Sequence, residues 1–89
     1  MLAREAALLR RARSELQGGD LPAALATLEL SQRDVPRPQL LQEREALLIE
    51  ALFRSGRRPE ATRRARDYLV RFPDSPHAGR VGALLTDQR

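Results

Sequence analysis

The chain has 89 residues, 42% of them hydrophobic and 31% charged, with a formal net charge of +4 at pH 7, and this length fits one small domain. It has no cysteine and one histidine, which excludes a disulfide framework and predicts neither a cofactor nor a metal site. All sixteen basic residues are arginine, but a charge of +4 is too small to indicate nucleic-acid binding, and charged residues interrupt every apolar run, which predicts no membrane insertion.

Residues 2–17 are expected to form an amphipathic helix, because apolar residues recur there at steps of three and four. These residues are Leu2, Ala6, Leu9, Ala12 and Leu16. Gly19 ends this helix, and Asp20 and Pro22 are a cap and a first-turn residue for a second one. Two later prolines predict an extended connection, so the first hairpin spans about residues 2–36.

The third predicted helix, about residues 38–54, is apolar around most of its circumference. Such a helix is stable when neighbours cover it on several sides, which predicts a central position. Gly56 ends it and Pro59 starts a fourth helix, so the second hairpin spans about residues 38–73. A last helix, about residues 76–87, is expected to cap the stack.

A shift of 37 residues superimposes the turn residues of the two hairpins on each other. It places Gly19 on Gly56, Pro22 on Pro59, Ala24 on Ala61 and Pro36 on Pro73. Recurrence of one helical hairpin at a fixed period is typical of a repeat protein.

This pattern of turn glycine, packing alanine and closing proline resembles the tetratricopeptide repeat, a helical hairpin of about 34 residues. The resemblance implies an all-α fold of five helices in a right-handed helical repeat, with two hairpins and a C-terminal capping helix. The period of 37 departs from the family pattern, as does the replacement of its first-helix aromatic residue by Leu8 and Glu45. The segment from Tyr68 to Ala78 is also similar to the repeats of bacterial cell-envelope and myxobacterial-type signalling proteins.

In that family the first helices of successive repeats line a concave groove that binds a partner. The matching candidates here are Leu9, Arg10, Arg13, Leu16, Gln17, Glu43, Ala46, Leu47, Glu50, Phe53, Arg54, Arg80 and Leu84. A lining of apolar and charged residues suits a peptide or an amphipathic helix. Leu47 and Phe53 have core packing as their alternative role. Three of the arginines, Arg10, Arg13 and Arg54, are candidates for pairing with a carboxylate of an acidic partner.

The sequence therefore predicts a protein–protein interaction module and no enzyme, since neither a partnered nucleophile nor a phosphate-binding loop is present. The arginines between Arg57 and Arg71 are interpreted as a solvated helix face, because Glu60 and Asp67 lie three or four residues from several of them. An acidic protein patch is the alternative partner for that face.

Two alternative functions remain open: a homodimerisation domain, and the soluble C-terminal regulatory domain of a membrane-anchored envelope protein. Residues 1–89 are expected to form one domain, either a complete protein or a piece of a longer one. The compartment is not predicted, and both a cytoplasmic and a periplasmic location fit.

Overall fold

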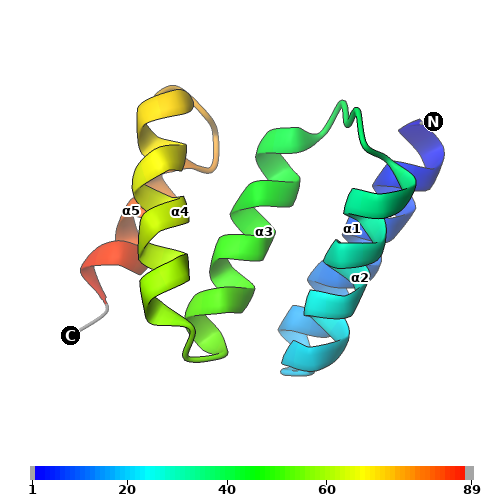
Figure 1. The fold of residues 1–89 in the computed structure, drawn as a ribbon, viewed down its shortest axis with the longest axis horizontal. Coiled ribbons are helices and arrows are strands. Elements are labelled where there is room, and N and C mark those ends of the chain that lie inside the picture. The colour runs from blue at the N-terminus through cyan, green and yellow to red at the C-terminus, as the bar shows by residue number, and fades with distance from the viewer. Residues whose placement is uncertain (1, 88–89) are drawn as a thin grey trace.

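The computed structural model describes residues 2–87 and folds this part of the chain into five α-helices, without a strand (Figure 1). The helices are α1 (Leu2–Gln17), α2 (Leu21–Asp34), α3 (Leu41–Arg54), α4 (Arg58–Arg71) and α5 (Ala78–Thr86). The predicted all-α class is confirmed. Within residues 2–87, no helix combines the length and apolar character needed to cross a bilayer.

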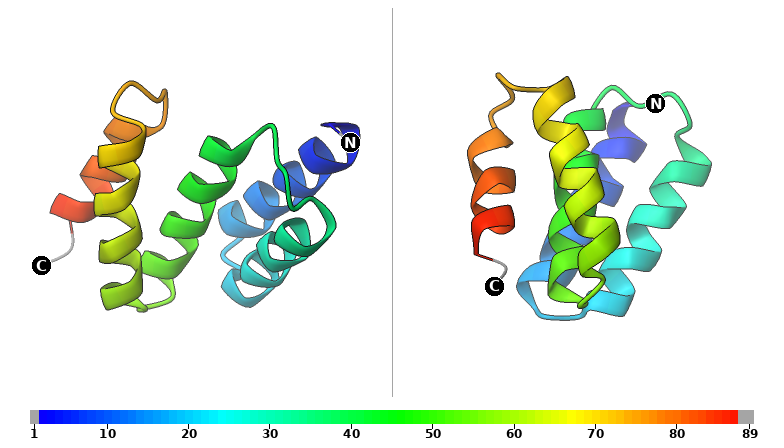
Figure 2. Two further views of the ribbon diagram at one scale, coloured as in Figure 1. Left: turned by 45° about the horizontal axis from the view of Figure 1, so that its top comes forward. Right: turned by 60° about the vertical axis from the view of Figure 1, so that its left-hand side comes forward.

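The central position predicted for the third helix is confirmed, because α3 packs against all four other helices. Figure 2 shows α3 between the α1–α2 pair and the α4–α5 pair, with successive helices antiparallel. Two apolar clusters lie on either side of it. Leu47 and Ala51 join the cluster built with α1 and α2, whereas Ile49 and Leu52 join the cluster built with α4 and α5. One helix thus supplies apolar residues to both halves of the core.

The turns that close the two hairpins have the same backbone geometry. Gly19 and Gly56 both adopt φ of +80°, a left-handed conformation that favours glycine. The amide of Gly19 donates to Leu16 at 3.0 Å, and that of Gly56 donates to Phe53 at 3.1 Å. The 37-residue shift seen in the sequence therefore recurs in the hydrogen bonds of the turns.

Two buried charged side chains hold the connection between the hairpins. Glu5 of α1, 1% exposed, accepts hydrogen bonds from the backbone amides of Gln39 and Leu40 at 3.0 and 2.8 Å, where α3 begins. Arg44 of α3, 6% exposed, donates to the carbonyls of Ser31 and Val35 at 3.2 and 3.0 Å, where α2 ends. Each charge lies at the helix end whose unpaired backbone groups and dipole favour it.

The predicted start of the third helix, about residue 38, is corrected to Leu41. Residues 36–40 form a connection with bends at positions 36, 37 and 39 rather than the extended segment expected from the prolines. The helix starts later because two prolines disfavour helical geometry and Glu5 binds the amides that precede it. The predicted start of the last helix at Pro76 is corrected to Ala78. Here the Ser75 hydroxyl accepts from the His77 amide at 3.0 Å, which stabilises a turn that includes Pro76.

Candidate peptide-binding groove

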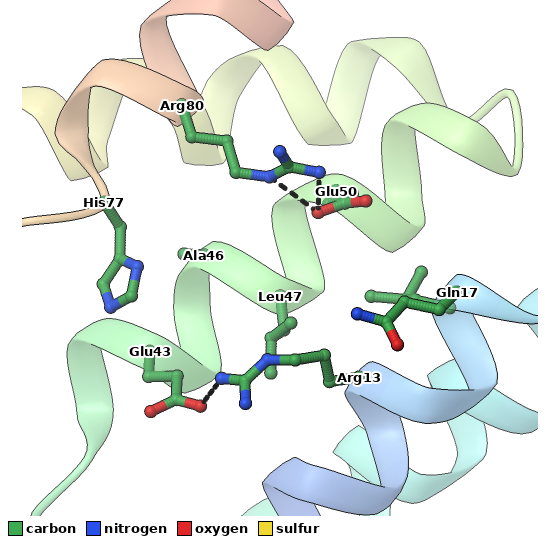
Figure 3. Close-up of a pocket in the computed structure, with 9 residues that line it drawn as sticks. Arg13, Gln17, Glu43, Ala46, Leu47, Glu50, His77 and Arg80 are labelled. Carbon is green, nitrogen blue, oxygen red and sulfur yellow. Dashed lines mark hydrogen bonds and ion pairs between the residues drawn. The ribbon is translucent and has the colours of Figure 1, made fainter.

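A hollow of about 250 Å³ lies where α1, α3 and the start of α5 meet (Figure 3). We call it the α1–α3–α5 groove, and it is lined by Arg13, Leu16, Gln17, Glu43, Ala46, Leu47, Glu50, His77 and Arg80. Its floor is apolar, because it is formed by Leu16, Ala46 and Leu47. These residues are 2%, 9% and 8% exposed. Its rim is charged. The groove therefore offers a small apolar contact inside a polar frame.

Two ion pairs flank this floor. Arg13 of α1 donates to Glu43 of α3, and Arg80 of α5 donates through Nε to Oε1 of Glu50 at 3.0 Å, with its Nη2 in an ion pair 2.8 Å from the same oxygen (Figure 3). Each pair joins α3 to a different neighbouring helix. The rim charges are thus held by side chains from three helices.

The two ion pairs occupy equivalent positions with exchanged charges. A shift of 37 residues takes Arg13 to Glu50 and Glu43 to Arg80. As a result α3 contributes both acids, whereas the helices beside it contribute both bases.

The acids and the bases of the rim differ in exposure. The side chains of Glu43 and Glu50 are 24% and 13% exposed, whereas those of Arg13 and Arg80 are 45% and 63% exposed. The carboxylates therefore lie underneath, and the guanidinium groups face solvent above them.

Most of the groove candidates from the sequence lie together here. They are Arg13, Leu16, Gln17, Glu43, Ala46, Leu47, Glu50 and Arg80. Leu16 and Leu47 also belong to the core cluster built with α1 and α2. Leu47 therefore has both of the roles considered for it, in the groove and in the core.

The remaining candidates lie outside the groove lining. The prediction for Leu9 is corrected, whereas Phe53 has the core position considered as its alternative. Leu9 is 1% exposed and Phe53 is 5% exposed, and both pack inside the apolar clusters rather than along the groove. Arg10 is exposed on α1 outside the groove lining, and half-buried Leu84 packs against the α4–α5 cluster. Arg54 binds the Leu16 carbonyl at 2.8 Å and lies 3.5 Å from Glu50, so it caps the C-terminal end of α1.

His77 lines the groove but is absent from the candidates named from the sequence. His77 directly precedes α5, as Leu40 precedes α3 at a shift of 37 residues. This equivalence was the signal available in the sequence. It places residue 77 directly before α5, at the end of that helix that lies beside α3. A second, shallower hollow of about 380 Å³ continues from Glu43 and His77 along residues 39–43 toward Phe72 and Pro76.

The basic run of α4 forms some of the predicted ion pairs. Arg64 lies 3.2 Å from Glu60, and Arg71 lies 3.5 Å from Asp67. Arg64 also reaches Glu45 of α3 at 3.3 Å, a contact between helices that spacing along one helix does not predict. Across residues 2–87, no three acidic or histidine side chains gather in a way that could hold a metal ion.

Comparison with models of known protein families found no match to this chain, and neither did searches of curated proteins and of solved structures. The resemblance to the tetratricopeptide repeat therefore stays a prediction from the sequence.

Proposed function

We propose that the chain is a non-enzymatic interaction module of the tetratricopeptide-repeat type, which binds a peptide or helix of a partner protein in the α1–α3–α5 groove. The observation that carries the proposal is the hollow between the two ion pairs, at whose bottom Ala46 and Leu47 are 9% and 8% exposed. Partner helices and peptides are recognised by such a combination, in which apolar anchors supply contact and charges fix the register.

The size of the hollow suits one anchoring side chain of a partner. Its volume of about 250 Å³ is below the roughly 300–1,000 Å³ of typical ligand pockets. An anchoring side chain needs less room, since the rest of its chain stays outside the pocket.

The repeated turn geometry supports the repeat class. The left-handed glycines at 19 and 56 and their equivalent hydrogen bonds indicate one hairpin unit used twice. In α5, the amide of Val81 donates to His77 as that of Arg44 donates to Leu40 in α3, at the same shift of 37 residues. This equivalence supports a third first-helix position in the stack, and α1, α3 and α5 are the helices that border the groove.

The test is an NMR titration of the ¹⁵N-labelled chain with amphipathic peptides that carry leucine anchors. We expect the amide shifts to concentrate at the residues lining the groove. Gln17→Trp adds bulk at the groove rim and should abolish these shifts, whereas Gln32→Trp, at an exposed position of α2, should leave them unchanged. Shift changes that survive Gln17→Trp, or that gather on another face, would contradict the proposal.

A further inference from the structure

The two arginines of the groove rim have hydrogen-bonding capacity left over. Arg80 donates through Nε to Glu50 and has Nη2 2.8 Å from the same carboxylate oxygen, and Arg13 donates through Nη2 to Glu43. Within residues 2–87, the structure shows no acceptor for Nη1 of Arg80 or for Nε and Nη1 of Arg13. A guanidinium group has five N–H donors and pairs readily with a second carboxylate.

The glutamates of the rim are less exposed than the arginines, and their carboxylates are engaged by arginine side chains. Glu50 is only 13% exposed and lies against both Arg80 and Arg54, while Glu43 is 24% exposed beneath Arg13. These carboxylates hold the guanidinium groups in place and offer little surface to a ligand. The charge that a ligand meets at the rim is therefore positive.

From this asymmetry, and resting on the proposed function, we infer that the α1–α3–α5 groove selects an acidic segment of its partner. An apolar side chain of that segment packs on Ala46 and Leu47, and one carboxylate on each side of it binds Arg13 and Arg80. The net charge of +4 favours the approach of such a partner.

The position of the two arginines indicates an internal segment rather than a chain end. Figure 3 shows Ala46 and Leu47 between the Arg80–Glu50 pair and the Arg13–Glu43 pair. A ligand that reaches both arginines must therefore continue past its anchor in both directions. The two glutamates are seven residues apart on α3, which corresponds to about 10 Å along the helix axis. A helical ligand matches this spacing with carboxylates at positions i and i+7 and an apolar anchor between them.

The experiment compares three labelled helical peptides with the same leucine anchors at i+3 and i+4. One has glutamate at i and i+7, one has glutamine and one has lysine. Fluorescence anisotropy with the full chain should show that the glutamate peptide binds about tenfold tighter than the glutamine peptide, with the lysine peptide weakest. Raising the salt concentration should reduce this difference.

Variants of the chain identify the groups responsible. Arg13→Gln and Arg80→Gln should each weaken the glutamate peptide about fivefold and leave the glutamine peptide unchanged. Arg66→Gln removes an exposed cation on α4 outside the groove and should change neither affinity. Glu50 keeps Arg54 as a neighbour in Arg80→Gln, so that variant is expected to stay folded.

The outcomes separate this inference from the proposed function. If the glutamine or lysine peptide binds the groove as tightly as the glutamate peptide, the inference fails and the binding function stands. The inference also fails, and the binding function stands, if Arg13→Gln and Arg80→Gln both leave the affinity for the glutamate peptide unchanged. If none of the three peptides shifts the groove amides, both the inference and the proposed function fail.

Discussion

Removal of the buried carboxylate of Glu5 tests whether one side chain joins the two hairpins. In Glu5→Ala the amides of Gln39 and Leu40 lose an acceptor in a part-buried site, where their hydrogen bonds measure 3.0 and 2.8 Å. Hydrogen bonds to a charged group contribute about 1.5–3 kcal/mol each, so the two together predict a loss of about 3–6 kcal/mol in the free energy of unfolding. Domains of this size have about 4–13 kcal/mol in total, so the variant is expected to be close to unfolded.

Urea denaturation followed by circular dichroism measures this loss. Glu5→Gln keeps one oxygen acceptor and should lose about half as much, which gives a measurable variant if Glu5→Ala does not fold. Glu29→Ala is the matched control, because Glu29 is exposed on α2, and its change should stay within about 0.5 kcal/mol. A loss below about 1 kcal/mol in the free energy of unfolding of Glu5→Ala would show that water replaces the carboxylate. It would refute the argument that the Glu5 side chain holds the two hairpins together.

Three further predictions concern the turns, the helix crossings and the groove rim. Gly56→Ala should lower the free energy of unfolding by about 1–2 kcal/mol, because φ is +80° at this position. Gly82→Ala should raise the free energy of unfolding by about 0.5–1 kcal/mol, because Gly82 lies inside α5 with open space around it. Chemical denaturation measures the sign of both changes. Ala61→Leu should cost about 1–3 kcal/mol, since Ala61 is 0% exposed at the crossing of α3 and α4, and an unchanged thermal midpoint would contradict this packing. The exchange Arg13→Glu with Glu43→Arg should stay within about 0.5 kcal/mol of the parent while each single reversal costs more, and a double-mutant cycle without coupling would show that the pair contributes nothing.

The helices and their turns were predictable because their signals are local. Gly19 and Gly56 mark turns through a conformation that other residues rarely adopt, and the structure gives both the same φ. The apolar circumference of α3 predicted a central helix, since only contacts on several sides bury such a surface. These properties depend on neighbours along the chain and therefore appear in the sequence pattern.

The buried charges were not predictable in the same way. Glu5 and Arg44 follow the polar pattern of a solvent-facing residue, but each binds backbone groups of another helix or connection. The 37-residue shift does not reveal them either. It pairs Ser31 with Tyr68 and Arg44 with Val81. Between α2 and α3 the long residue is Arg44 on α3 and the small one is Ser31 on α2. Between α4 and α5 the long residue is Tyr68 on α4 and the small one is Val81 on α5.

The division between groove and core also exceeded what the pattern could show. Leu9 and Leu47 are both apolar first-helix residues, yet only Leu47 borders the groove. Which side of a helix remains open depends on the angle between neighbouring helices, and that angle is set by packing rather than by the period of the sequence. The sequence therefore named the helices that border the hollow and most of the residues that line it, whereas Leu9 lies in the core and Phe53 has the core position considered as its alternative.

The exchange of charges between equivalent positions determines the polarity of the groove. If each position kept the charge of its equivalent 37 residues earlier, position 50 on α3 would carry an arginine and position 80 on α5 a glutamate. The α5 side of the groove would then present an acid, and positive charge would be limited to α1 and α3. With Glu50 and Arg80 in place, α3 holds both carboxylates beneath the arginines of its two neighbours, and cations stand on both sides of the apolar floor. Conversion of Glu50 and Arg80 to the unexchanged arrangement should therefore keep an ion pair between positions 50 and 80, at the cost of the contact between Glu50 and Arg54 and of about 0.3–0.5 kcal/mol for two arginines four residues apart. Affinity for a ligand with carboxylates on both sides of its anchor should fall about as far as in Arg80→Gln.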